Sequence, residues 1–295
     1  MDDQTDLLVC VVHFILLRHV EYGQELVLNL LQETSLRLLD SSSTTELPSP
    51  DRVVVGIRAV LVTLRAMEKD MTMPVWPSSW DLNAAIPASD YPSSAERLPN
   101  AFWEAPHRTA LTEFRTRYTR LIETLAVSLG VRLARAHYFD AQFTLARIGE
   151  SMEERDAFII REHGSGHMAA YPKTLAPEIA ILQACFDALP RCVSPGAPKL
   201  DQMLDIALGC GVSVEPALAA AAERLVLRLA NDNVYATRTA QHATRFLFAQ
   251  SQILRGPPEV FLLVELEPML KLWKAVVEAW AKSALPRRAP SRSLS

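Results

Sequence analysis

Regular helical periodicity over residues 177–285 is the feature that most constrains the fold of this chain. Amphipathic segments follow one another there with short breaks, and no strand pattern separates them. Apolar residues recur at helical spacing, as in Leu218 and Leu225 after the helix-opening Pro216. Each segment is about as long as one arm of a HEAT or armadillo repeat. The pattern predicts an all-α, HEAT/armadillo-like helical repeat, or α-solenoid.

Breaks in this periodicity divide the chain into four predicted parts. They are N-terminal helical repeats at 1–69, a Pro/Trp-rich loop at 70–106, a helical repeat array at 107–284 and a disordered tail at 285–295. The loop contains six prolines, a density that no long helix tolerates. Before it, Ser49-Pro50 offers an N-cap followed by proline and predicts a helix start at that point.

Local signals add expectations about individual helix ends. Gly23 is expected to supply a turn between two helices within 7–39. Gly130 is expected to end the first helix after the loop, with a further helix from about 131 to 148. A short helix near 152–161 and a glycine-rich inter-helix turn are expected next. No strand is predicted anywhere in the chain.

Composition limits the class of protein. Hydrophobic residues make up 49% and charged residues 22% of the chain, which suits a folded core rather than a disordered polymer. The net charge of -4 gives no overall attraction to phosphate backbones, so nucleic acid is not an expected partner. The apolar stretch 7–17 is shorter than a membrane span and is expected to be a core helix. Four cysteines without close pairs or metal-ligand spacing indicate thiols in a reducing, cytoplasmic setting.

One short cluster invites a catalytic interpretation, because two imidazoles flank a serine in His163-Gly164-Ser165-Gly166-His167. A helical zinc motif needs a regular helix, which the two glycines prevent, and a nucleophile elbow needs a preceding strand. We therefore interpret the cluster as an inter-helix turn and keep a hydrolase using His163, Ser165 and His167 as the less favoured alternative. The sequence predicts no catalytic residue, no cofactor and no metal site.

Two groups of residues are candidates for partner binding. Trp76, Trp80 and Trp103 lie in the proline-rich loop, where large aromatic side chains either pin the loop to the helices or capture a peptide. The last helix carries Leu266, Leu270, Trp273, Val277 and Trp280 on one face and Lys271, Lys274 and Lys282 on much of the other. Those lysines either bind an acidic partner or form a solvated surface.

Two separated segments resemble a known family. The stretch DRVVVGIRA at 51–59, which runs into Met73-Pro74, is similar to the helix and proline loop of the Furry family, called cell morphogenesis proteins in fungi. The later stretch ACFDALPRCV at 184–193, with the two following helices and the closing Leu270-Lys271-Leu272-Trp273, resembles the central repeats of that family.

The resemblance implies a non-catalytic scaffold that supports an NDR-type kinase and its Mob coactivator in polarised growth and cell-shape control. It also implies a cytoplasmic location at the cell cortex or growth site. No catalytic residue carries over from the family. The alternative that the residues leave open is a generic adaptor whose tryptophan loop binds peptides.

Overall fold

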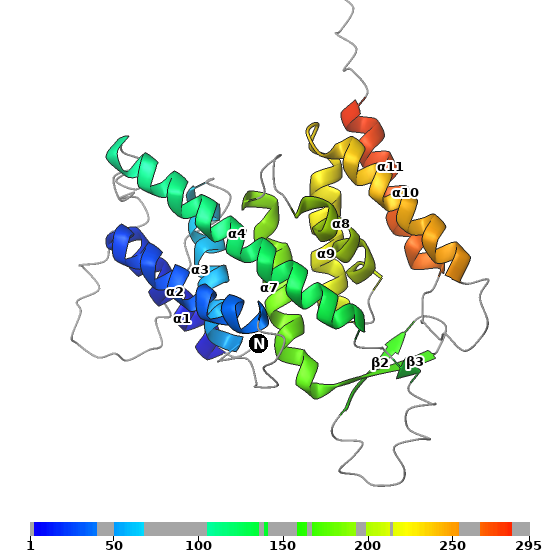
Figure 1. Ribbon diagram of the computed structural model, residues 1–295, viewed down its shortest axis with the longest axis horizontal. Helices are drawn as coiled ribbons and strands as arrows, with labels where there is room; N and C mark the ends of the chain where they lie inside the picture. The colour runs from blue at the N-terminus through cyan, green and yellow to red at the C-terminus, as the bar shows by residue number, and fades with distance from the viewer. Residues whose placement is uncertain are drawn as a thin grey trace, which may run out of the picture. The chain divides into compact units, whose positions relative to one another are not determined.

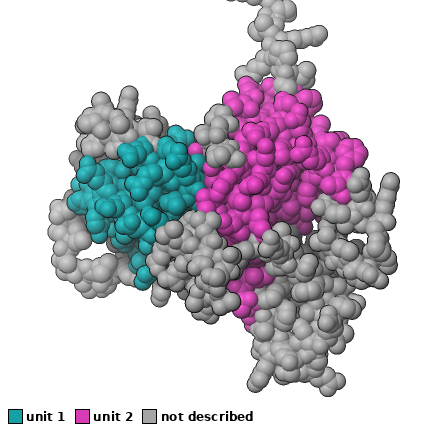
Figure 2. Space-filling view, in the orientation of Figure 1, with its two compact units in different colours: residues 1–122 teal, residues 123–295 magenta. Residues whose placement is uncertain are grey.

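The fold is built from two compact units, residues 1–122 and 123–295 (Figure 2). The computed structural model describes residues 3–39, 50–67, 105–135, 139–140, 158–163, 167–192, 199–212, 215–253 and 266–284. Nearly all of these residues are helical (Figure 1).

The described residues of the first unit form three helices and the beginning of a fourth. These are α1 (Asp3–Arg18), α2 (Val20–Leu39), α3 (Pro50–Met67) and the part of α4 (Ala105–Arg135) up to residue 122. Helices α1, α2 and α3 pack against one another in each pairing. Tyr118 of α4 is buried and donates its hydroxyl proton to the carbonyl oxygen of Ile57 in α3 at 3.2 Å. Pro50 opens α3, as its sequence predicts.

The bend between α1 and α2 corrects the predicted role of Gly23. The chain turns at His19, and Gly23 lies one helical turn inside α2. A Cβ atom at position 23 would lie 2.8 Å from the Cα of Leu16 in α1. The residue is therefore needed for the close approach of the two helix backbones, since no side chain fits between them.

The second unit is organised around α9 (Pro216–Ala230). Four further helices of its described part each contact α9, namely α7 (Ala176–Cys192), α8 (Leu200–Cys210), α10 (Ala236–Ile253) and α11 (Leu266–Ala284) (Figure 1). The end of α4, from residue 123, also belongs to this unit. Ala221 and Ala222 of α9 are completely buried, so small side chains at these positions let neighbouring helices approach closely. Arg224 and Arg228 lie on the exposed side of the same helix, as predicted.

A small antiparallel sheet corrects the expectation that the chain has no strands. It consists of β1 (Phe139–Asp140), β2 (Phe158–His163) and β3 (His167–Pro172) in the order β1-β3-β2. Residues 158–161, expected to be helical, belong to β2, and β1 lies where the helix 131–148 was expected. The run Phe158-Ile159-Ile160 is aromatic and β-branched, which suits a paired strand. A 3-10 turn (Lys173–Leu175) then leads into α7.

The helical class is nevertheless confirmed, since helices and helix-to-helix contacts make up most of the described structure. The predicted loop 70–106 lies outside the described residues except for its last two, which begin α4, and the predicted tail 285–295 lies outside them entirely.

Gly130 also differs from expectation, because α4 continues through it to Arg135. A Cβ atom at position 130 would overlap Cγ2 of Ile206 in α8 and lie 2.9 Å from its Cδ1. Ile206 is β-branched and its Cγ2 cannot swing far away. The glycine is thus explained by the contact of α4 with α8.

Substitution of this glycine should reverse the usual preference of helices for alanine. We expect Gly130→Ala to lower the free energy of unfolding by about 1–3 kcal/mol through overpacking. Gly209→Ala is the matched control, because nothing lies within 4 Å of a Cβ at that helical position; it should raise stability by up to about 1 kcal/mol. Urea unfolding followed by circular dichroism measures both. An equal gain at the two positions would contradict the proposed contact with Ile206.

A buried histidine links α1 to α3 inside the first unit. His13 is 3% exposed, and its Nδ1 lies 2.8 Å from the hydroxyl oxygen of Thr63. That hydroxyl donates its only proton to the carbonyl oxygen of Ala59 at 2.8 Å, so Nδ1 of His13 is the donor to Thr63. The other ring nitrogen, Nε2, is buried without a hydrogen-bond partner among the described residues. Burial lowers the pKa of His13 from 6.5 to about 4.

This histidine should make the protein less stable in mild acid. The unfolded chain binds a proton on His13 near pH 6.5, whereas the folded chain binds one only near pH 4. The contribution of the neutral ring to the free energy of unfolding is therefore fully present above pH 6.5. It falls by about 3 kcal/mol in total as the pH drops from 6.5 to 4. Chemical unfolding at a series of pH values should show this slope in the wild type and a flatter one in His13→Gln. His19→Gln, at an exposed histidine, should keep the wild-type slope; an unchanged slope in His13→Gln would exclude His13 as its cause.

Candidate functional site

Two tryptophans of α11 hydrogen-bond to two threonines of α10, and the tryptophans have the same spacing as the threonines. The indole Nε1 of Trp273 donates to Thr244 Oγ1 at 3.1 Å, and that of Trp280 donates to Thr237 Oγ1 at 3.3 Å. The two tryptophans and the two threonines are each seven residues apart, in opposite directions along the chain. The helices are therefore antiparallel, with a defined register.

The face of α11 that becomes buried is rotated from the one that the sequence suggested. Its buried residues are Met269, Leu272, Val276 and Ala279. The predicted apolar stripe lies beside this face: Leu270 is 43% exposed, and Trp273, Val277 and Trp280 are half-buried at its edge. The last helix thus presents a partly apolar strip to the surface.

The predicted lysines lie next to this strip. Lys271, Lys274 and Lys282 are exposed, and within the described residues none of the three forms an ion pair. Glu267, Leu270, Lys271 and Lys274 line a shallow hollow on α11. Such a surface offers ammonium groups beside apolar carbon, which suits contact with an acidic protein segment.

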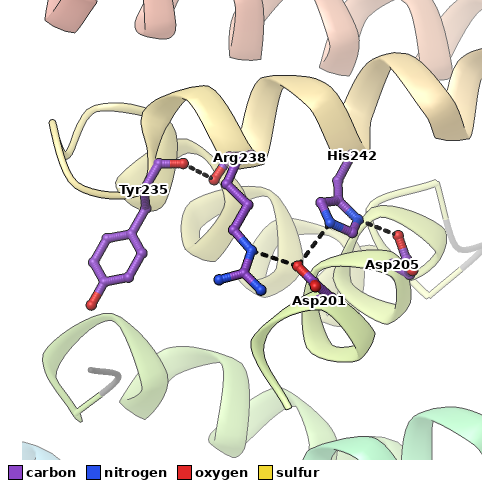
Figure 3. Close-up of polar contacts among 6 residues, drawn as sticks. Asp201, Asp205, Tyr235, Arg238 and His242 are labelled. Atoms are coloured by element: carbon purple, nitrogen blue, oxygen red, sulfur yellow. Dashed lines mark hydrogen bonds and ion pairs between the residues drawn. The ribbon is translucent and has the colours of Figure 1, made fainter. Parts of the chain in front are cut away.

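A charged cluster connects α8 with α10 (Figure 3). Arg238 Nε donates to Asp201 Oδ1 at 2.6 Å, and His242 Nε2 lies 2.9 Å from the same oxygen. His242 Nδ1 lies 2.6 Å from Asp205 Oδ1. Figure 3 shows the arginine and the histidine of α10 pointing toward the two aspartates of α8. We call these four residues the α8–α10 clamp.

Asp201 and Arg238 of the clamp each stabilise the charged form of the other. The guanidinium of Arg238, which donates to Asp201, lowers the pKa of Asp201 from 3.8 to about 2, with a smaller contribution from His242. The same hydrogen bond raises the pKa of Arg238. The aspartates are about half exposed whereas the ring of His242 is nearly buried. The clamp is therefore a surface ion-pair network around one enclosed imidazole.

The clamp resembles a catalytic Asp–His pair in composition but not in geometry. A general base needs one ring nitrogen directed at a substrate, whereas both nitrogens of His242 face carboxylate oxygens. The arrangement can hold two helices together, but it leaves no nitrogen of this ring for proton transfer.

Two of the three residues of the hydrolase alternative lie on paired strands. His163 ends β2 and His167 begins β3, and the two are cross-strand partners in the ladder. Ser165 lies outside the described residues. The segment therefore joins two strands, whereas a nucleophile elbow joins a strand to a helix. The interpretation as an inter-helix turn is also wrong, since strands flank it.

The other sequence candidates meet different outcomes. Trp76, Trp80 and Trp103 lie outside the described residues. In the part of the chain that the structure describes, no three His, Cys, Asp or Glu side chains could hold a metal ion together. None of the described helices is long and apolar enough to cross a membrane.

The comparisons identify the family. The family model described as cell morphogenesis N-terminal matches residues 1–281. The chain belongs to the cell morphogenesis N-terminal family. This confirms the resemblance to Furry and the fungal cell morphogenesis proteins. Comparison with curated proteins and with solved structures gives no match.

Family membership gives this cell morphogenesis domain a role related to morphogenesis. Sequence reasoning missed its clamp. Asp201 and Asp205 are one helical turn apart, as are Arg238 and His242. The helix that opens at Pro216 separates the two charged helices along the chain, so this spacing alone does not pair them.

Within this cell morphogenesis domain, the clamp should contribute measurably to stability. A double-mutant cycle with Asp201→Ala and Arg238→Ala should give a coupling energy of about 1 kcal/mol, near the upper end of the range for solvent-exposed ion pairs. The reason is that Asp201 accepts from two donors. The matched cycle is Asp187 with Arg224, an isolated pair at 2.7 Å, which should give less. A coupling energy of zero for Asp201 and Arg238 would show that the clamp does not stabilise the fold.

Proposed function

We propose that this cell morphogenesis domain is a non-catalytic helical-repeat scaffold that binds an NDR-type kinase together with its Mob coactivator. It would act in the cytoplasm, at the cell cortex or at sites of polarised growth. The observation that supports this proposal most directly is the family match over residues 1–281. The kinase and the coactivator follow from the resemblance to Furry.

The helical architecture supports a scaffold role on physical grounds. Helices packed side by side expose long rows of side chains, which suit extended contact with another protein. In the clamp, both imidazole nitrogens of His242 lie within hydrogen-bond distance of carboxylate oxygens. Binding therefore accounts for the described surface features better than catalysis does.

Helix α11 is our candidate for part of the binding surface. Its three lysines are exposed, and Leu270 adds exposed apolar area beside two of them. The hydrogen bonds of Trp273 and Trp280 fix the helix on α10, so little order has to be gained on binding. An acidic patch on the kinase or on Mob would complement this surface.

Binding to a purified NDR-type kinase and Mob complex tests the proposal. The wild-type chain should bind, and the variant Lys271→Glu/Lys274→Glu/Lys282→Glu should bind at least about tenfold more weakly at low salt. Arg228→Glu, at an exposed position of α9, is the matched control and should bind like the wild type. Circular dichroism verifies that each variant is folded.

Two results would contradict parts of the proposal. Folded wild-type chain that fails to bind the complex would exclude the kinase and Mob as direct partners. Binding that survives the lysine reversal but is lost in Trp76→Ala/Trp80→Ala/Trp103→Ala would favour the alternative, an adaptor that uses its tryptophan loop.

A further inference from the structure

Helix α1 carries apolar side chains on both of its faces. Its inner face, with Val9, Val12 and Leu16, is buried in the first unit. Its outer face consists of Leu7, Leu8, Val11, Phe14 and Ile15, and none of these side chains is buried. Leu8 is 51% exposed and Phe14 is 44% exposed. A helix that is apolar all round is typical of a helix covered on both sides.

The spacing of the outer residues suits a second helix. Leu8, Val11 and Ile15 follow one another in steps of three and four, as do Leu7, Val11 and Phe14. This is the spacing that lets side chains of two helices interlock. Because Val11 lies at the middle of both rows, the stripe has nearly the same shape when it is read in either direction.

The charges at the two ends of α1 suit a second copy of the helix in the antiparallel direction. Asp3 and Asp6 lie in the first turns of the helix, and Arg18 is in its last turn. The guanidinium of Arg18 lies 5.7 Å from the centre of the Phe14 ring, at the end of the stripe. A second α1 in the antiparallel direction brings each acidic end to a basic end, whereas a parallel one opposes like charges. Antiparallel helices also place opposite dipole ends together.

We propose that two copies of this chain associate through the outer faces of α1, in an antiparallel pair related by a two-fold axis near Val11. The same patch serves both copies, so the contact closes on itself and stops at a dimer. This assembly goes beyond the proposed kinase scaffold and uses none of the lysines of α11. It covers apolar area that a single copy leaves in water.

Sedimentation of the full chain over a range of concentrations tests the dimer. The wild type should dimerise reversibly, and Val11→Asp should weaken association at least about tenfold, because a carboxylate would be buried at the axis. Val11 is not part of the core of its own copy, so the helical content of the variant should not change. Leu270→Asp, at an exposed leucine of α11, should dimerise like the wild type. A monomeric wild type, a dimer that resists Val11→Asp, or a dimer lost in Leu270→Asp would overturn the proposal.

Charge reversal tests the antiparallel direction. Asp3→Lys/Asp6→Lys and Arg18→Glu should each weaken the dimer, and the triple variant should recover it, since opposite charges again face each other. Asp6 also pairs with Arg58 at 3.3 Å, so Arg58→Gln serves as the control and should leave association unchanged. A triple variant weaker than both of its parents would overturn the two-fold arrangement.

Discussion

The second unit depends on the close packing of α9. Four other helices contact this one helix, and they can do so because Ala221 and Ala222 present almost no side chain to them. Leu225 and Val226 fill the remaining space and are completely buried. Larger residues at the alanines would force the neighbours apart, since a packed core does not absorb extra volume without strain. The stack of helices in this unit therefore follows from a short run of small residues.

Polar contacts decide which helices pair once the apolar faces are buried. Apolar packing tolerates sliding and rotation more readily than directed hydrogen bonds do. The α8–α10 clamp joins two helices at two successive turns, through Asp201 and Asp205. Lys199 adds a hydrogen bond of 3.0 Å to Thr124 in the later part of α4. These contacts favour one arrangement among several that would bury similar apolar area.

The sequence predicted the parts of the fold that repeat a simple pattern. Helices such as α9 and α11 have long apolar periodicity, and Pro216 marks the start of α9, so their class and place were predictable. The strand β2 was not, because six residues are too few to distinguish a strand from one helical turn by periodicity. The role of Gly130 was hidden for another reason. Local sequence cannot show that Ile206 of a distant helix lies against it.

The candidate site was predictable to a similar extent. The exposed lysines of α11 follow from its amphipathic pattern, and the structure places all three on the surface. The exact buried face did not follow, because Leu270 and Leu272 are equally apolar and only packing against neighbours distinguishes them. The clamp required knowing that α8 lies beside α10. Its residues are 37 and 41 positions apart, a separation that a single sequence does not connect.

The two tryptophans of α11 have a consequence for how this helix can move. Trp273 and Trp280 repeat with the same interval as their acceptors Thr244 and Thr237. A slide of α11 along α10 by one turn, about 5.4 Å, breaks both hydrogen bonds together and brings neither indole to the other threonine. Both hydrogen bonds can form together in only one register of the two helices. Small displacements of α11 along α10 are thus opposed at two points of the helix at once.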